Sequence, residues 1–168
     1  DLGGSDRKCA AVIDGEVVFS EEFKWNPYFK HDPNYHIDGV YEILKRAASH
    51  LPRVDGIGGA AAGIIVGNEV RASSLFRGLS KEDFESKIRR IFFDLQERFY
   101  NVPFEVVNDG DVAALVGSMS LGVNGLLGIA MGTSQAAGYV DANGNITGID
   151  DGAENKVLNY NQNNRLVK

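Results

Sequence analysis

The chain of 168 residues has little of several features that would narrow its function at once. It contains one cysteine, Cys9, so no internal disulfide can form, and a single cysteine fits a cytoplasmic location. Its histidines, His31, His36 and His50, have no cysteine neighbours at zinc-ligand spacing, which argues against a zinc site. No apolar run approaches the roughly 20 residues that cross a bilayer, and the first residues lack the layout of a signal peptide. We therefore expect no membrane partner.

An excess of basic residues is missing as well. The chain has 17 Lys and Arg against 23 Asp and Glu, which gives a formal net charge of −6, and both signs are mixed along the chain. Duplex nucleic acid requires a basic stripe, so we expect no nucleic-acid partner. An apolar content of 43% is ordinary for a soluble globular protein, and the length fits one compact domain or one and a fraction.

Three dipeptides that readily adopt positive φ angles predict β-hairpins. They are Asp14-Gly15, Gly67-Asn68 and Asn143-Gly144, each between β-rich runs.

Apolar residues at helical spacing predict three helices, over residues 37–49, 80–100 and 111–120. Ser80 with Asp83 resembles a capping box at the start of the second helix. Buried strands are expected at "VDGIGGAA", "FEVV" and "LLGIAM". Because strands and helices alternate after an opening of hairpins, we predict an α/β fold with a mixed sheet and helices on its faces.

The first of three chemically suggestive turns is "DLGGS", residues 1–5. Its two glycines allow backbone N–H groups to approach an anion, and Ser5 offers a hydroxyl donor. Asp1 could hold a magnesium ion through its water shell. The alternative is a tight turn before a hairpin, without a ligand.

The other two turns each follow a buried strand. Gly132-Thr133-Ser134 can offer N–H and O–H donors to phosphate oxygens, although many hairpins turn on such residues. Asn108-Asp109 lies where a strand gives way to a helix, and Asp109 there is either a base or a turn or cap residue. Asp111 is the better candidate for the helix cap, because it directly precedes the helical run.

In this order the turns resemble the motifs of the sugar kinases of the actin, Hsp70 and hexokinase superfamily, and most closely those of the ROK family (repressors, open reading frames, kinases). The segments "DLGGS", "GGAAAGIIV", "NDGDVAAL" and "GTS" occupy the places of that family's first phosphate loop, sugar-side glycine segment, sugar-ligand and base motif, and second phosphate loop. The resemblance runs from Asp1 to about Gly148.

The resemblance implies an actin-like ATPase domain of the ribonuclease H type and a glucokinase-like, ATP-dependent phosphorylation of a sugar or sugar derivative, with ATP and Mg²⁺ as cofactors. It implies Asp109 as the general base and Asp1 as the residue that orients magnesium through water. A sugar substrate is the expected partner, and a homodimer is compatible with the family. The implied sugar ligands are Asn108, Gly63 and Ser74, and the implied phosphate contacts are Gly3, Gly4, Ser5, Gly132, Thr133 and Ser134.

The chain also departs from that family's pattern. The first loop ends in Ser5-Asp6 where the family has Thr-Lys, so a cation is lost that Arg7 or Lys8 could replace. The sequence contains neither E-x-G-H nor a C-x-C-G-x-x-G-C zinc motif. We expect residues 1–122 to form an N-terminal sugar/ATP lobe without the start of its first strand. Residues 123–168 would then begin a second, incomplete ATPase lobe.

Three other interpretations stay open at this point. One is an N-acetylglucosamine kinase-type relative with similar turns. Another is a sugar-sensing binding protein of the same fold without catalysis. The last is a structural fragment in which the glycine turns are only turns.

Overall fold

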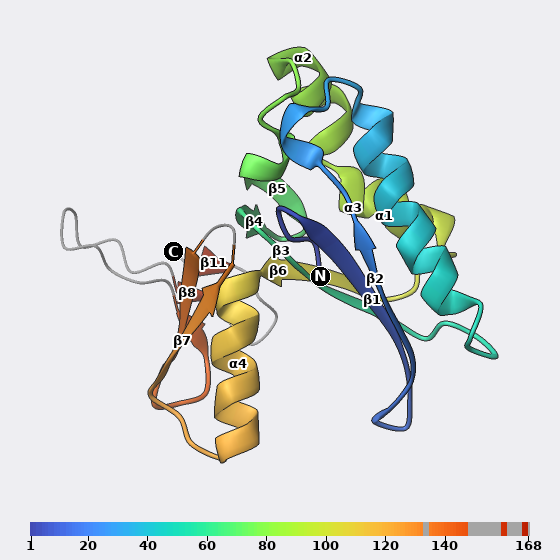
Figure 1. Cartoon of the computed structure of the whole chain (residues 1–168). Coiled ribbons are helices and arrows are strands. Elements are labelled where there is room, and N and C mark those ends of the chain that lie inside the picture. The colour runs from blue at the N-terminus through green and yellow to red at the C-terminus, as the bar shows by residue number, and fades with distance from the viewer. Residues whose placement is uncertain (133–134, 148–158, 161–165, 168) are drawn as a thin grey trace.

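The structure is a computed structural model that describes residues 1–132, 135–147, 159–160 and 166–167 (Figure 1). The strands are β1 (Asp6–Ile13), β2 (Glu16–Lys24), β3 (Ile57–Ala61), β4 (Ile64–Val66), β5 (Glu69–Ala72), β6 (Phe104–Asn108), β7 (Leu126–Met131), β8 (Gln135–Val140), β9 (Ile146–Thr147), β10 (Asn159–Tyr160) and β11 (Leu166–Val167). The helical segments are η1 (Pro27–Phe29), α1 (Pro33–Ala48), η2 (Ser74–Phe76), α2 (Lys81–Asp83), η3 (Phe84–Ile88), α3 (Ile91–Arg98) and α4 (Asp109–Leu121). This is a mixed α/β fold, as the alternating pattern predicts.

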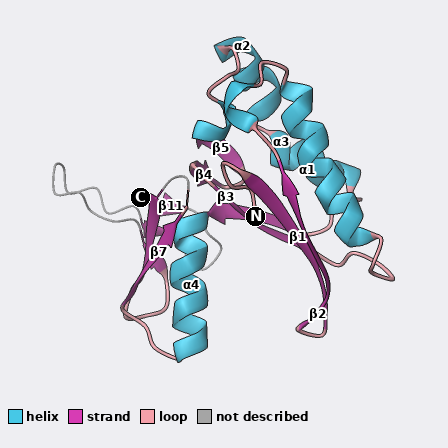
Figure 2. Cartoon of the chain, viewed as in Figure 1, coloured by secondary structure: helices cyan, strands magenta, loops and turns pink. Residues whose placement is uncertain are grey.

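Two strand pairs meet near the N-terminus (Figure 2). β1 and β2 are antiparallel, whereas β3 and β6 are parallel. Leu2 lies between the pairs, with an antiparallel bridge to Arg7 of β1 and a parallel bridge to Ala61 of β3. Ala61 in turn pairs with Asn108, the last residue of β6. Because these residues are level across the sheet, the turn after Leu2 and the helix after Asn108 begin at the same edge.

Helices cover one face of these strands. α1 packs against β1, and α3 packs against β5 and β6. The Asp32 side chain caps α1 by accepting a hydrogen bond from the Asn34 N–H at 2.9 Å, so the helix begins four residues before the predicted start. Buried apolar side chains from strands and helices form one cluster, with Leu2, Val40, Ile43, Leu75, Ile88, Ile91, Phe92, Leu95, Phe104 and Val106 among its members. In the part of the chain that the structure describes, no helix has the length and apolar character to cross a membrane.

The continuous helix predicted over residues 80–100 is interrupted. Ser80 caps its start, as predicted, by accepting from the Asp83 N–H at 3.0 Å. The next turn, η3, is a π-helix, and α3 begins only at Ile91. The carbonyl oxygen of Arg89 accepts a hydrogen bond from the Val70 N–H of β5 at 3.0 Å. This tertiary bond accompanies the break, and the apolar spacing contains no sign of it.

α4 packs closely on a second sheet, in which β7, β8 and β9 are antiparallel neighbours. A Cβ added to Gly128 of β7 would lie 2.1 Å from the Ala114 nitrogen, and one added to Gly138 of β8 would lie 2.6 Å from the Asp111 Cα. Real Cβ atoms do not approach other atoms so closely. The two glycines therefore let helix backbone lie directly on strand backbone, which fixes the start of α4 against β8.

Candidate active site

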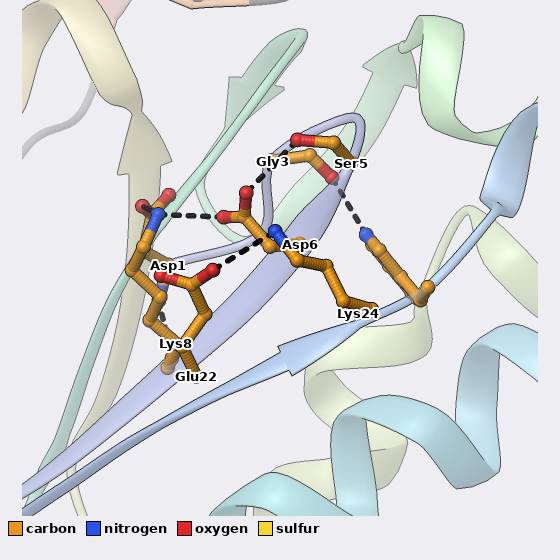
Figure 3. A network of polar contacts seen from close by, with 8 residues as sticks. Asp1, Gly3, Ser5, Asp6, Lys8, Glu22 and Lys24 are labelled. Atoms are coloured by element: carbon orange, nitrogen blue, oxygen red, sulfur yellow. Dashed lines mark hydrogen bonds and ion pairs between the residues drawn. The ribbon is translucent and has the colours of Figure 1, made fainter.

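The first glycine turn is held by bonds from three sides (Figure 3). Asp1 and Lys8 exchange two backbone hydrogen bonds, at 2.8 and 2.9 Å, and the Gly3 N–H donates to the Asp6 carbonyl oxygen at 3.0 Å. The indole Nε1 of Trp25 donates to the Gly3 carbonyl oxygen at 2.8 Å. The turn is thus fixed to β1 and to Trp25, the residue that follows β2.

Asp6 occupies the position at which the ROK family, whose motifs the sequence resembles, has lysine. The Lys8 ammonium pairs with the Asp6 carboxylate, and the Ser5 hydroxyl donates to it at 2.9 Å (Figure 3). The hydrogen bond from Lys8, followed by that from Ser5, lowers the pKa of Asp6 below its usual value. The Lys8 ammonium also lies 3.8 Å from the Asp1 carboxylate. Lys8 therefore brings a positive charge to the turn.

Arg7, the other basic residue considered as a substitute for the missing lysine, points away from the turn. Its guanidinium donates to Glu42 of α1 at 2.7 Å and lies 5.6–5.7 Å from the ring centres of Phe23 and Trp25. Successive side chains of a strand point to opposite faces, so only one of Arg7 and Lys8 can face the turn. That residue is Lys8.

Asn108, not Asp111, caps α4, and the helix begins at Asp109. The Asn108 Oδ1 accepts from the Gly110 N–H at 2.8 Å, and its Nδ2 donates to the carbonyl oxygen of Gly63 at 2.8 Å. The prediction of Asp111 as the cap was wrong, because Asp111 lies inside the first turn. Asn108 retains one amide hydrogen and one lone pair on Oδ1 for a ligand.

Asp109 and Asp111 are two carboxylates in one helical turn with different surroundings. The Oδ1 of Asp109 is buried and has no hydrogen-bond partner among the described residues. Burial, and secondarily the charge of Asp109, raise the pKa of Asp111 from 3.8 to about 6. A buried carboxylate oxygen without a donor is costly, and such oxygens are found where a ligand, water or ion completes the bonding.

A cavity of about 500 Å³ brings the first turn and Asp109 together. Its polar lining consists of Asp1, Gly3, Gly4, Ser5, Asp6, Lys8, Asp109 and Gly132. Five of the residues predicted to contact phosphate or metal therefore line the same cavity as Asp109, the predicted base. Thr133 and Ser134 lie outside the described residues. Lys8 and Asp6 are additions to the site, and strand alternation after the turn is the signal that could have identified Lys8.

The residues predicted to bind sugar do not all lie around this cavity. Gly63 has a φ of +129°, and a Cβ there would lie 2.4 Å from the Ala72 carbonyl oxygen, so only glycine fits. Its carbonyl oxygen is the partner of Asn108. Ser74 is exposed and does not line the cavity. Its neighbour Ser73 is closer to this region, because its hydroxyl bonds to the Ala62 carbonyl oxygen.

The arrangement suits an anion and a hydroxyl group side by side. Backbone N–H groups of a glycine turn, with the Lys8 ammonium, are donors for phosphate oxygens, and the Ser5 hydroxyl becomes one if it turns away from the Asp6 carboxylate. A carboxylate such as that of Asp109, with a buried oxygen that no described residue bonds, is an acceptor for the proton of a hydroxyl group. In the described part of the chain, no three metal-ligating side chains come together, so any cation here would need water or ligand oxygens in addition.

Comparison with known proteins gives the same fold in solved sugar-kinase structures. No protein-family model and no curated protein sequence matches the chain. The inorganic polyphosphate/ATP-glucomannokinase of Arthrobacter sp. strain KM is similar at 23% identity and a TM-score of 0.62, covering 84% of this chain and 56% of its own. A candidate sugar kinase from Cytophaga hutchinsonii is similar at 17% identity and a TM-score of 0.64, covering 98% of this chain and 54% of its own. The chain thus spans about half the length of these structures and shares with them a mixed α/β fold.

Proposed function

We propose that the chain forms the sugar- and nucleotide-binding lobe of an ATP-dependent sugar kinase of the ROK family, with Asp109 as the general base. The observation that carries this proposal is that Asp109, whose buried Oδ1 has no hydrogen-bond partner among the described residues, lines one cavity with the glycine turn. Residues 1–122 would be the first lobe, and residues 123–168 would begin the second. The fold shared with two sugar-kinase structures supports the proposal.

In the proposed reaction Asp109 accepts the proton of a sugar hydroxyl. The freed oxygen forms a bond to the terminal phosphorus of ATP, and the bond from that phosphorus to the bridging oxygen breaks, releasing ADP. Phosphoryl transfer depends mainly on positioning and on neutralising phosphate charge, which the turn at Gly3, Gly4 and Ser5 would contribute with Lys8. The second phosphate turn would be Gly132-Thr133-Ser134.

Magnesium would supply charge neutralisation at the phosphates, and the donor set suits a cation held largely through water. Asp1 is the residue we assign to it, because its carboxylate lines the cavity and is half exposed. Asn108 would hold a neighbouring sugar hydroxyl with its remaining amide hydrogen, and Gly63 would position Asn108. Ser74 stays a predicted sugar ligand; it is the exposed residue of η2, whose other two residues, Leu75 and Phe76, are buried.

One observation favours a second candidate, a sugar-binding protein without catalysis. The cavity is lined by the carboxylates of Asp1, Asp6 and Asp109, against the single ammonium of Lys8 among the described side chains that line it. This charge balance opposes a nucleotide unless a cation accompanies it.

The test is a coupled ATP-consumption assay across hexoses and N-acetylhexosamines, with and without Mg²⁺, with sugar binding measured separately by calorimetry. We expect sugar-dependent turnover that Asp109→Asn lowers by about 10²–10⁴-fold, the usual contribution of a general base. Asp14→Asn, the same change in the exposed β1–β2 turn, should leave turnover unchanged. Turnover retained in Asp109→Asn would exclude this residue as the base, and sugar binding with no turnover would favour the binding protein. An arm with inorganic polyphosphate tests a donor that the similar glucomannokinase has in its name.

A further inference from the structure

The carboxylate of Asp6 lies inside the glycine turn to which the function proposed above assigns phosphate. A Cβ added to Gly3 would lie 3.7 Å from the Asp6 Oδ1, and the Asp6 side chain is only 17% exposed. It lines the same cavity as Asp109. Figure 3 shows the carboxylate between the Ser5 hydroxyl and the Lys8 ammonium. The chain therefore places an anion of its own beside the turn.

The partners of this carboxylate are donors that a phosphate group needs. The Ser5 hydroxyl donates to the Asp6 Oδ2 at 2.9 Å, and the Lys8 ammonium pairs with Oδ1. Asp6 and Lys8 are two residues apart in β1, so both side chains point to the same face of the strand. The ammonium also lies 3.8 Å from the Asp1 carboxylate. The hydroxyl and the positive charge of the turn are thus already bonded to carboxylates of this chain.

The backbone donors of the turn are in a different position. The N–H groups of Gly4 and Ser5 make no hydrogen bond to any residue that the structure describes. A carboxylate offers two oxygens, whereas a terminal phosphate group offers three. A phosphate can therefore accept from these N–H groups as well as from the Ser5 hydroxyl and the Lys8 ammonium. It has more donors available to it than the Asp6 carboxylate uses.

We propose that Asp6 is an internal competitor of phosphate at this turn: its carboxylate holds the Ser5 hydroxyl and the Lys8 ammonium until an anionic ligand displaces it. This role rests on the proposed function, because it concerns the phosphate-binding turn that the function requires. After displacement the Asp6 charge remains near the ligand, since the Gly3 N–H holds the Asp6 backbone. A phosphate complexed with Mg²⁺ meets less repulsion there than a free one. Asp6 thus selects against free polyphosphate anions and in favour of their magnesium complexes.

The pKa of Asp6 reports the displacement. The hydrogen bond from Lys8, followed by that from Ser5, lowers this pKa. A bound anion removes these bonds and adds a negative neighbour, and both changes raise the pKa of Asp6. Carbon-detected NMR of the unchanged chain should show this rise when inorganic tripolyphosphate is added. An unchanged pKa of Asp6 at saturating tripolyphosphate overturns the proposal without any variant.

Substitution of Asp6 tests the competition directly. Asp6→Asn keeps the shape of the side chain and removes its charge. We expect it to bind metal-free tripolyphosphate about tenfold more tightly in calorimetry, with a smaller gain in the presence of Mg²⁺. The control is Glu22→Gln, which removes the same charge opposite Lys8 on β2, where Glu22 pairs with Lys24. It should change the affinity by about twofold or less, because charges in an exposed pair are screened by water.

The same substitution in Lys8→Met isolates the part that depends on the ammonium. Without Lys8, Asp6→Asn relieves only repulsion, so the gain in affinity should fall from about tenfold to about threefold. An equal gain with and without Lys8 would show that Asp6 does not withhold the ammonium from the anion, and would overturn the proposal.

Binding and turnover together distinguish the competitor from the kinase. Equal binding of tripolyphosphate by the unchanged chain and Asp6→Asn overturns the competitor and leaves the kinase standing. Tighter binding by Asp6→Asn, with no sugar-dependent turnover in either protein, supports the competitor and contradicts the kinase. No binding by either protein overturns both, because the turn is then not an anion site.

Discussion

The side chain of Asn108 connects Gly63 to the first turn of α4: its Nδ2 donates to the Gly63 carbonyl oxygen and its Oδ1 accepts from the Gly110 N–H, both at 2.8 Å. One amide therefore joins the segment at Gly63 to the helix that carries Asp109.

Replacing this amide should destabilise the fold. Asn108→Ala removes a helix cap and leaves the Gly63 carbonyl oxygen without its partner, so we expect a loss of about 1–3 kcal/mol in the free energy of unfolding. Urea denaturation followed by circular dichroism measures it. Asn143→Ala, in an exposed turn, is the control and should change the free energy by less than about 0.5 kcal/mol. Equal effects of the two changes would contradict the bridging role.

A substitution by alanine should destabilise the fold at Gly128 but not at Gly58. A Cβ at Gly128 would lie 2.1 Å from backbone of α4, whereas one at Gly58 meets nothing within 4 Å. We expect Gly128→Ala to lower the free energy of unfolding by about 1–3 kcal/mol, because the backbone must move to admit the methyl group. Gly58→Ala should stay within about 0.5 kcal/mol of the unchanged chain. Thermal unfolding of both variants measures these changes in stability. An unchanged stability of Gly128→Ala would show that α4 does not lie so close to β7.

The pKa of Asp111, raised to about 6, should depend partly on Asp109. Carbon-detected NMR titration should show a lower Asp111 pKa in Asp109→Asn, with part of the shift remaining because burial is the larger cause. A carboxyl whose pKa is raised by folding stabilises the fold below its unfolded pKa, and this contribution is lost as pH rises to about 6. Asp111→Asn should therefore raise stability at pH 7 and change it little at pH 3. An unchanged Asp111 pKa in Asp109→Asn would mean that the two carboxylates do not interact.

His36 should make stability depend on pH in the opposite sense. It is fully buried, its Nε2 faces the carbonyl oxygens of Pro27 and Leu75, and burial lowers its pKa from 6.5. Because folding favours the neutral ring, the stability that depends on His36 is fully present above pH 6.5. It falls as the pH drops through 6.5 toward the lowered pKa. Urea midpoints between pH 8 and pH 5 should fall more steeply in the unchanged chain than in His36→Gln. The exposed His50→Gln should behave like the unchanged chain.

The sequence predicted the turns and the helix cap that depend only on residues close together in the chain. The Asp14-Gly15 and Gly67-Asn68 turns adopt the positive φ angles expected of them, with Asp14 at +52° and Asn68 at +62°. Ser80 caps its helix because the cap needs only residues three apart. The interruption before α3 was not predictable in this way, because the Arg89 carbonyl oxygen bonds to a strand 19 residues earlier in the chain, at Val70.

The same distinction applies to the candidate site. The order of the turns in the sequence predicted that Gly3, Gly4, Ser5 and Gly132 would accompany Asp109, and one cavity brings them together. The choice between Asn108 and Asp111 as cap depended on Gly63, 45 residues away, which holds the Asn108 amide in place. The choice between Arg7 and Lys8 was different, because strand alternation after the turn could have identified Lys8, and the bond from Arg7 to Glu42 of α1 agrees with it.

The hydrogen bond from Trp25 to Gly3 gives the chain an optical probe of its own. Trp25 is the only tryptophan in the sequence, and its indole N–H donates to the first glycine of the turn. Indole emission responds to the polarity and bonding around the ring, so a ligand that displaces the Gly3 carbonyl oxygen changes the fluorescence without any label. Anions, nucleotides and sugars can thus be screened against the unmodified chain by titration in a cuvette.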